Sequence, residues 1–389
     1  MTSSQPLLPG STLGVLGGGQ LGRMFVHAAQ AMGYFTAVLD ADPDSPAGLV
    51  SHHHIRTGYE DPAGLAELAR VADAVTTEFE NVPAAALAAL AAQRPVSPAA
   101  SAVSVAQDRA REKAHFVGCG VPCAPYAVIE TTEQLAAVPT DLLPGILKTA
   151  RMGYDGKGQV RVKTAAGLAA AWDSVGRVPC VLEKMLPLAL ECSVIVARGA
   201  DGAMVHLPVQ RNLHRDGILA VTEVYEHNLP PALAAQAVAA AKSVAEGLQY
   251  VGVLCVEFFV LQDGSLVVNE IAPRPHNSGH YSQNACDVSQ FELQVRTLAR
   301  LPLTQPRQHS AAVMLNLLGD LWFAHGGDTA QTPPWAQVLA LPGTHLHLYG
   351  KRDAKRGRKM GHLNITAATP EAARATALKA AGLLGIAPF

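Results

Sequence analysis

The stretch Tyr250–His280, YVGVLCVEFFVLQDGSLVVNEIAPRPHNSGH, decides the fold, because it holds two apolar runs separated by a turn. The dipeptide Asp263-Gly264 between the runs is the strongest short-range signal for a β-hairpin. The stretch therefore predicts two antiparallel strands that meet at this dipeptide.

The predicted hairpin brings two acidic side chains together. Counting outward from the turn pairs Leu261 with Leu266 and, further along, Glu257 with Glu270. Directly opposite residues have Cβ atoms roughly 5 Å apart, so two like charges there are destabilising. A shared proton or a bound cation resolves the conflict, and paired carboxylates suit Mg²⁺. With a slipped register, both side chains would instead lie in solvent without a ligand.

Composition limits the class of protein. The chain has 389 residues, 49% hydrophobic and 16% charged, which is enough for two or three domains with sizeable cores. The net charge of −2 argues against broad nucleic-acid binding. The six cysteines form no C-x-x-C pair and predict reduced thiols. Because neither a signal peptide nor a membrane-spanning stretch is evident, we expect a soluble cytoplasmic protein without a membrane partner.

The first glycine loop lies near the N-terminus. A predicted strand at Thr12–Leu16 runs into Gly17–Gly22, which fits G-x-G-x-x-G, and a helix and a second strand at Tyr34–Leu39 follow. Backbone N–H groups at such a loop can hold an anion. Asp40 lies near where a ribose-binding acid would be, so an NAD(P) oxidoreductase is one interpretation. A tight strand-to-helix turn without a ligand is another.

Acidic residues follow a later predicted strand, in the segment Glu78–Pro83. At the carboxyl edge of a doubly wound sheet they would face a ligand, although they are also suited to cap the next helix. A helix is predicted over Pro98–Val117, and it carries Arg109. The glycines and proline of Gly118–Pro122 predict the first domain boundary.

A second glycine loop, Arg151–Gly158, follows a predicted strand that ends at Lys148. Its glycines make a hairpin tip whose backbone N–H groups can wrap phosphate oxygens, and Lys148 and Lys157 add positive charge. A plain surface hairpin would explain one glycine but not three. Together with the distant carboxylate pair, this loop predicts phosphoryl chemistry.

Six motifs together resemble one family of the ATP-grasp superfamily, the 5-(carboxyamino)imidazole ribonucleotide synthetases. The motifs are Gly19–Met24, Glu78–Pro83, Gly153–Gln159, Asn212–Leu219, Asn269–His280 and Gly361–Asn364. The resemblance covers nearly the whole chain in the family's order. It implies an α/β fold with an N-terminal doubly wound (Rossmann-like) domain (1–118), a two-lobed ATP-grasp domain (119–308, lid lobe about 119–183) and a small C-terminal α+β domain (309–389).

The resemblance also implies a reaction. Bicarbonate would attack the γ-phosphate of ATP, and the resulting carboxyphosphate, through CO₂, would carboxylate the exocyclic amine of 5-aminoimidazole ribonucleotide in purine synthesis; whether the CO₂ becomes free is left open. Mg²⁺ would be the cofactor and ATP a co-substrate, and the enzyme would be a homodimer. The implied metal ligands are Glu257 and Glu270. Ala272 stands where many ATP-grasp enzymes have Asn, which leaves the number of Mg²⁺ ions open.

The remaining site residues come from the same resemblance. The ATP contacts would be Arg109, Lys148, Gly153, Tyr154, Asp155, Gly156, Lys157, Gly158, Gln159, Glu183, Lys184, Met185, Leu186, Glu191, His214, Asn269 and Glu270. The ribonucleotide would contact Gln20, Leu21, Glu80, Tyr154, Asp155, Lys351 and Arg358, so that the first glycine loop would serve a ribonucleotide phosphate. The catalytic residues would be Arg274, His276 and Lys351, with bicarbonate and the amine meeting at the first two.

The basic run Lys351–Lys359 admits two interpretations. Most of its charges are typical of a solvated loop, whereas one or two would suffice to bind a phosphomonoester. Rival functions are another ATP-grasp carboxylase, a ribonucleotide transformylase, the NAD(P) oxidoreductase and a catalytically dead nucleotide-binding protein. The intact Lys148, Glu257 and Glu270 argue against the last of these.

Overall fold

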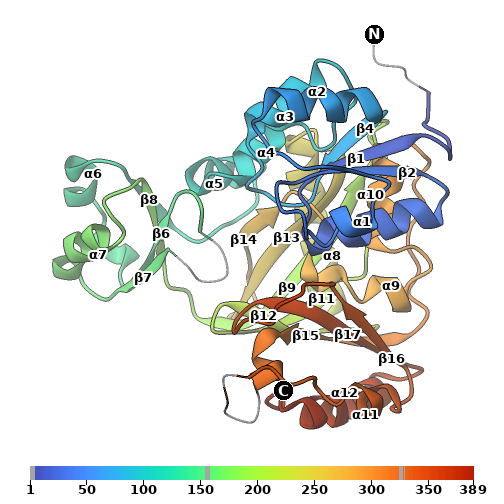
Figure 1. The fold of residues 1–389 in the computed structure, drawn as a ribbon. Coiled ribbons are helices and arrows are strands. Elements are labelled where there is room, and N and C mark those ends of the chain that lie inside the picture. Colours follow the sequence, from blue (N-terminus) through green and yellow to red (C-terminus); the bar gives the residue numbers. More distant parts are fainter. Residues whose placement is uncertain (1–4, 154–157, 324–326, 328) are drawn as a thin grey trace.

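Sheets in three parts of the chain organise the computed structural model, which describes residues 5–153, 158–323, 327 and 329–389 (Figure 1). Among these described residues, no helix is both long enough and apolar enough to cross a membrane. All six cysteines are free.

The N-terminal part is a parallel sheet in the order β3-β2-β1-β4 with helices on both faces. Its elements are β1 (Thr12–Leu16), α1 (Gln20–Ala31), β2 (Phe35–Leu39), β3 (His53–Ile55), α2 (Pro62–Val71), β4 (Ala74–Thr77), α3 (Ala84–Ala91) and α4 (Ala100–Ala106). The apolar strands pack against α1 on one face and against α2 and α3 on the other. The predicted doubly wound architecture is confirmed.

The predicted helix over Pro98–Val117 is wrong in its continuity, because the chain breaks it into α4 and α5 (Arg109–Gly118). Asp108 lies at the break, and its side chain accepts from the N–H groups of Ala110 and Arg111 at 3.1 and 3.3 Å. Such an N-cap competes with a continuing helix. The break starts a helix at Arg109, whose N–H donates to the carbonyl of Ala150 at 2.9 Å.

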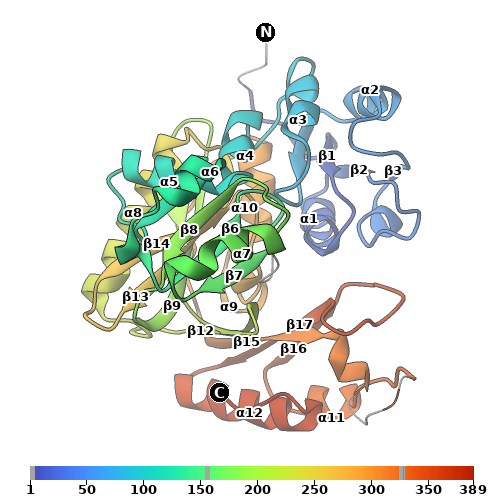
Figure 2. The ribbon, with the colours of Figure 1, turned by 90° about the vertical axis from the view of Figure 1, so that its left-hand side faces the viewer.

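A small antiparallel sheet in the order β5-β8-β6-β7 projects from one side in Figure 1 and faces the viewer in Figure 2. Its elements are β5 (Tyr126–Ile129), α6 (Thr132–Ala136), β6 (Gly145–Thr149), β7 (Gln159–Val162), α7 (Leu168–Ser174) and β8 (Cys180–Lys184). A separate core around Trp172 and Leu182 holds it together. The second glycine loop connects β6 to β7.

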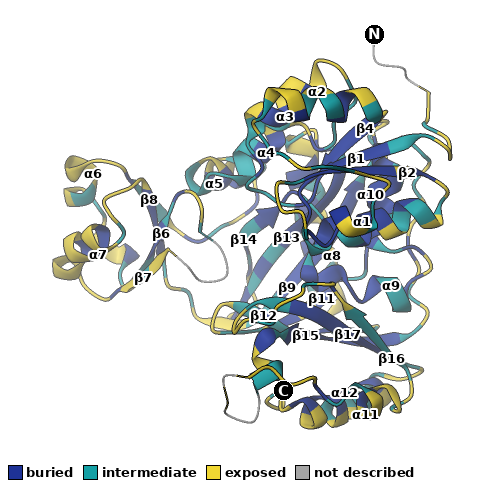
Figure 3. Cartoon of the chain, viewed as in Figure 1, coloured by how far each residue is buried: buried dark blue, intermediate teal, exposed yellow. Residues whose placement is uncertain are grey.

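The largest sheet has the order β14-β13-β9-β11-β12-β15-β17-β16, with β10 beside β9. Its first part contains β9 (Leu188–Arg198), β10 (Met204–His206), β11 (Gln210–Arg215), β12 (Ile218–Val224), α8 (Pro231–Gly247), β13 (Gly252–Leu261), β14 (Leu266–Ala272), α9 (Ser282–Ala285) and α10 (Gln290–Leu298). Helix α10 lies between this sheet and α1. The strands of this largest sheet are mostly buried, whereas the outer faces of the peripheral helices are exposed (Figure 3).

The C-terminal strands extend this same sheet. They are β15 (Ala311–Leu318), β16 (Thr344–Leu348) and β17 (Lys359–Ala367), accompanied by α11 (Trp335–Leu339) and α12 (Pro370–Leu384). β15 pairs with β12 along four residues, from Val221 opposite Leu315 to Val224 opposite Ala312. This pairing covers the edge of β12, which would otherwise present unpaired backbone groups. The domain limits 1–118, 119–308 and 309–389 remain a prediction.

The hairpin β13–β14 reaches the predicted carboxylate pair by a different register. The loop is three residues, Gln262–Gly264, with Gly264 at a positive φ of 83°. The strands pair Val260 with Leu266, Phe259 with Val267 and Phe258 with Val268, one residue off the predicted count. A β-bulge then restores Glu257 opposite Glu270. The pairing of the two acids is confirmed, and the predicted pairing of Leu261 with Leu266 is wrong.

Candidate active site

A cavity of about 610 Å³ is lined by residues from all three of these sheet-containing parts of the chain. The predicted site residues among them are Gln20, Leu21, Glu80, Arg109, Lys148, Gly153, Gln159, Glu183, Lys184, Met185, Leu186, Glu191, His214, Glu257, Asn269, Glu270, Arg274 and His276. The topology therefore brings most of the predicted residues to one place.

Other predicted residues do not line this cavity. Gly158, Lys351 and Arg358 are described but are not among its lining residues, whereas the neighbouring Lys359 is. Tyr154, Asp155, Gly156 and Lys157 lie outside the described residues.

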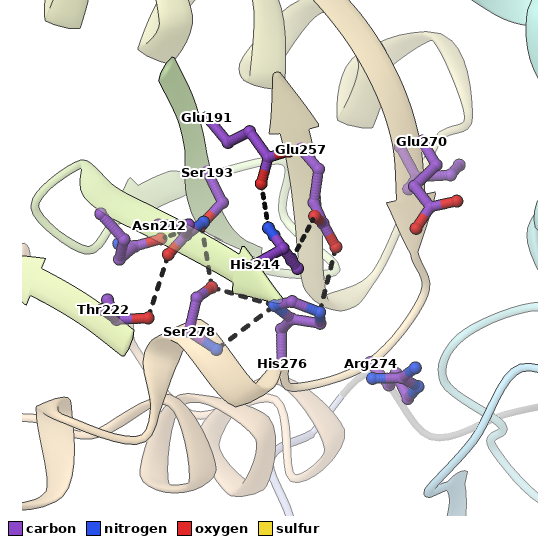
Figure 4. Close-up of polar contacts among 12 residues, drawn as sticks. Glu191, Ser193, Asn212, His214, Thr222, Glu257, Glu270, Arg274, His276 and Ser278 are labelled. Carbon is purple, nitrogen blue, oxygen red and sulfur yellow. Dashed lines mark hydrogen bonds and ion pairs between the residues drawn. The ribbon is translucent and has the colours of Figure 1, made fainter. Parts of the chain in front are cut away.

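The two opposed acids each have a basic partner. Glu257 Oε1 lies 3.1 Å from His276 Nε2, and Glu270 Oε2 accepts from Arg109 Nη1 at 3.0 Å (Figure 4 shows the two acids). Burial would raise the pKa of Glu257, but the two nearby histidines and Arg274 lower it to about 2. Both acids line the cavity.

These residues fit a magnesium ion. Glu257 and Glu270 supply carboxylate oxygens, and Asn269 Oδ1 is buried with no hydrogen-bond partner among the described atoms. A buried polar atom without a partner is unfavourable, and an amide oxygen is a donor that Mg²⁺ accepts alongside carboxylates and phosphates. The donor set is all oxygen, as a hard cation requires.

His214 connects a third acid, Glu191, to the same site. Its Nδ1 makes a short hydrogen bond with Glu191, and its Nε2 lies 4.0 Å from Glu257. Burial would lower the pKa of His214, but the hydrogen bond to Glu191 and the charge of Glu257 raise it above the usual value. β9 and β11 lie side by side here, with Glu191 opposite Asn212.

Glu183 is held between two lysines rather than facing the cavity alone. Lys148 Nζ donates to its Oε2 at 3.0 Å, and Lys113 Nζ lies 3.3 Å from its Oε1. Burial would raise the pKa of Glu183, whereas the two lysines lower it. Lys113 was not predicted, although the spacing Arg109-x-x-x-Lys113 would have placed both cations on one face of α5.

Glu112 is another site residue that the sequence did not reveal. It lines the cavity and is 2% exposed, and its Oε1 accepts from the N–H of Ile271 at 2.7 Å. Burial and the charge of Glu270 raise its pKa to about 8, despite the neighbouring Arg109. The carboxyl group fixes α5 against β14 directly behind Glu270.

Arg274 and Glu80 connect the central and N-terminal parts. Arg274 Nε donates to Glu80 Oε2 at 2.5 Å, and its Nη1 donates to the carbonyl of Pro275 at 3.1 Å. Burial would raise the pKa of Glu80, but Arg274 lowers it to about 2. The residues predicted for bicarbonate and for the ribonucleotide are therefore in direct contact.

That the first glycine loop holds a ribonucleotide phosphate stays a prediction, and three of the loop's N–H groups have protein partners. Glu78 Oε1 and Oε2 accept from the N–H groups of Gly19 and Gly22 at 2.8 and 2.9 Å. The N–H of Gly18 donates to Asp40 Oδ2 at 2.7 Å. Protein carboxylates thus occupy these three donors, and a substrate anion or a dinucleotide pyrophosphate has no access to them. Gln20 and Leu21 still line the cavity.

We expect Gly19→Ala to destabilise the protein by about 1–3 kcal/mol. A Cβ at Gly19 would lie 2.4 Å from Glu78 Oε1, and that oxygen is fixed by the hydrogen bond from Gly19. Urea denaturation measures the change. Gly118→Ala is the control, because nothing lies within 4 Å of its added Cβ. Equal stability of both variants would contradict the role of Glu78 in the loop.

Lys351 lies beside the cavity rather than in its wall. Its Nζ donates to the carbonyl of Lys359 at 2.7 Å and lies 5.7 Å from the ring centre of Tyr349. Burial, with the charge of Arg358, lowers its pKa to about 8. The nearby acid Glu78 acts in the opposite direction, so the ammonium group faces the region where the N-terminal and C-terminal parts meet.

Family models match the three parts of the chain. A ribonucleotide synthetase preATP-grasp domain matches residues 11–107, an ATP-grasp domain matches 114–291, and the C-terminal domain of phosphoribosylaminoimidazole carboxylase matches 312–376. The match to the ATP-grasp domain includes the hairpin with both acids.

Relatives that match over nearly the whole chain have the same family assignment as these domain matches. The N5-carboxyaminoimidazole ribonucleotide synthase of Brucella melitensis is 43% identical over 92% of this chain and 96% of its own length. That of Bacillus subtilis is 37% identical over 93% of each. Among solved structures, an ADP complex of N5-carboxyaminoimidazole ribonucleotide synthetase has a TM-score of 0.89 at 39% identity, covering 97% and 98% of the two chains. The Aspergillus clavatus synthase with ADP and 5-aminoimidazole ribonucleotide has 0.87 at 31%, covering 97% and 99%.

Proposed function

The chain belongs to the N5-carboxyaminoimidazole ribonucleotide synthase family and is an ATP-dependent ligase of the ATP-grasp type, and on that premise we propose how its cavity uses bicarbonate. The reaction carboxylates the exocyclic amine of 5-aminoimidazole ribonucleotide in purine biosynthesis. The proposal is that bicarbonate is activated as carboxyphosphate between the carboxylate pair and Arg274.

One observation carries the proposal. The same cavity is lined by Glu257 and Glu270, by Arg274 and His276, and by Glu80 of the N-terminal part. An ATP site and a ribonucleotide site would therefore share one enclosed space, as transfer of a reactive intermediate requires.

The chain's own residues divide the work. Lys148 and Arg109 neutralise the phosphates of ATP, while bicarbonate oxygen attacks the γ-phosphate and ADP leaves. Arg274 and the Nε2–H of His276 hold the bicarbonate oxygens. The amine nitrogen of the ribonucleotide then bonds to the carboxyl carbon, the C–O bond between that carbon and the phosphate oxygen breaks, and the departing phosphate takes up the amine proton. The reaction requires that water be excluded from the cavity, because water would hydrolyse carboxyphosphate.

Magnesium belongs to the same proposal. Glu257, Glu270 and Asn269 would hold Mg²⁺, which when bound supplies positive charge to the phosphate oxygens. That this chain is a cytoplasmic homodimer stays a prediction.

The test is ADP release from Mg-ATP in degassed buffer, with bicarbonate and 5-aminoimidazole ribonucleotide added separately and together. Fast release only with both supports the proposal. Release with bicarbonate alone, unchanged by the ribonucleotide, would contradict the assigned acceptor. Release without bicarbonate would contradict carboxyphosphate formation.

We expect Lys351→Ala to raise the KM for the ribonucleotide about tenfold with little change in the KM for ATP, because it removes one charge that attracts the substrate phosphate. The pKa of Lys351 in the folded protein, about 8, sets the direction in which the KM for the ribonucleotide changes with pH. The ammonium charge is present below pH 8 and is lost above it, so the wild-type KM for the ribonucleotide should rise as the pH passes 8. Initial rates at varied substrate and pH measure both effects.

Lys355→Ala is the matched control, because Lys355 is an exposed cation of the same basic run. It should leave both KM values unchanged. An equal rise in both KM values for Lys351→Ala, or the same pH dependence with and without Lys351, would contradict a phosphate contact.

A further inference from the structure

A buried chain of hydrogen bonds lies behind His276, on the side of the ring away from Glu257 (Figure 4). The hydroxyl of Ser278 lies 2.9 Å from His276 Nδ1, and the N–H of Ser278 donates to the same nitrogen at 3.3 Å. His276 Nε2 faces Glu257 at 3.1 Å. The imidazole is thus held at both nitrogens by different parts of the chain.

The series of hydrogen bonds continues from Ser278 across three strands. Ser193 on β9 donates to Ser278 Oγ at 2.8 Å, Asn212 on β11 donates to Ser193 Oγ at 2.9 Å, and Thr222 on β12 donates to Asn212 Oδ1 at 3.0 Å. The residues Ser193, Thr222 and Ser278 are 0% exposed, and Asn212 is 7% exposed. A satisfied buried network of this kind restricts each member to one rotamer.

The directions of these bonds follow from the donors. The N–H of Ser278 can only donate, so Nδ1 of His276 is an acceptor, and the ring N–H is then on Nε2 and points at Glu257. Because Asn212 donates to Ser193, and Ser193 donates to Ser278, the hydroxyl hydrogen of Ser278 is left for Nδ1 at 2.9 Å, with the sulfur of Cys255 as its other neighbour. Ser193 has a second, longer acceptor in Gln210 Oε1 at 3.0 Å.

We infer that Ser278 is a positioning residue for His276: its hydroxyl and N–H fix the ring so that Nε2–H faces the space beside Glu257. The inference rests on the proposed role of His276 toward bicarbonate. The contact is made at Nδ1, so it persists when Glu257 turns to another ligand. His276 would then present Nε2–H to a substrate oxygen without reorganisation.

The matched control is Ser282, another serine of the same segment that is 0% exposed. Its hydroxyl donates to the carbonyl of Gly279 at 2.6 Å and accepts from the N–H of Gln290 at 3.0 Å, with no ring as partner. Ser278→Ala and Ser282→Ala therefore delete the same atom at equal burial, but only the first frees His276.

The first test measures two KM values and the ratio of product to ADP, because none of these quantities depends on the fraction of active enzyme. For Ser278→Ala we expect the KM for bicarbonate to rise roughly tenfold, the KM for ATP to stay within twofold, and the product formed per ADP released to fall at least about threefold. Ser282→Ala should keep wild-type values of all three. Wild-type values of all three quantities in Ser278→Ala would overturn the inference. The same changes in both variants would also overturn it.

The second test does not depend on the reaction. Crystal structures of the wild type and of Ser278→Ala should show the His276 ring in one orientation in the wild type and rotated or in two rotamers in the variant. An unchanged ring would overturn the inference. Where Ser278→Ala does not fold, Ser193→Ala removes the next bond and should give the same changes to a smaller extent, whereas wild-type behaviour of that variant would overturn it.

The two tests separate this inference from the proposed function. A wild-type enzyme that releases no ADP in response to bicarbonate and the ribonucleotide would refute the function. The ring orientation would still decide whether Ser278 positions His276.

Discussion

Glu270→Gln should lower ATP turnover by on the order of a thousandfold. Glu270 lies opposite Glu257 across the hairpin, lines the cavity and accepts from Arg109 at 3.0 Å. The amide keeps the shape but removes the charge that would bind Mg²⁺, and it weakens the hold on Arg109. ADP release at varied Mg²⁺ measures the effect.

Asp263→Asn is the control for this substitution, because it neutralises an exposed acid at the tip of the same hairpin. Its turnover should match the wild type. Near-normal turnover of Glu270→Gln at saturating Mg²⁺ would refute Glu270 as a metal ligand. Recovery only at high Mg²⁺ would instead support weakened metal binding.

Arg274→Ala should abolish carboxylation and also destabilise the fold by about 3 kcal/mol at pH 7, since it leaves the largely buried Glu80 without its partner. The pKa of Glu80 is about 2 in the wild type, below its usual value. The stabilisation is therefore complete above the ordinary pKa and is lost as the pH falls toward 2. The stability gap between wild type and variant should narrow below about pH 4.5.

A second substitution separates the two effects of Arg274→Ala. Adding Glu80→Gln removes the unpaired charge, so the double variant should regain most of the lost stability in urea denaturation but none of the carboxylation. Arg70→Ala breaks an exposed pair with Glu67 and serves as the control, with no measurable change expected. A double variant as unstable as Arg274→Ala would show that the ion pair is not the cause.

The ATP-grasp hairpin shows how far local rules reach. The turn dipeptide and the alternating strands predicted Glu257 opposite Glu270, and the structure has them paired. The intermediate register was wrong, because a three-residue loop and a β-bulge each shift the count by one residue in opposite directions. The bulge leaves Asn269 of β14 as the extra residue, and a count from the turn dipeptide does not show it.

The first glycine loop shows what local rules leave open. Its glycines predicted an anion site, and the N–H groups of Gly19 and Gly22 donate to the carboxyl group of Glu78, 59 positions away from Gly19. Nothing in the loop itself distinguishes a phosphate from a protein carboxylate, because both satisfy the same N–H groups. The parallel pairing of β1 with β4 brings Glu78 to the loop.

The sequence by itself determined the fold class and the carboxylate pair, and its motifs implied most of the predicted site residues that line the cavity, because these depend on turn chemistry, strand patterning and the family resemblance carried by short motifs. Only the tertiary structure decided the pairing of Arg274 with Glu80 across 194 positions, the place of Lys113 and Glu112 behind the acids, and the chain from Thr222 to His276. These contacts join side chains from different sheets and helices. Their partners are set by the packing of whole elements, which no short segment of the chain specifies.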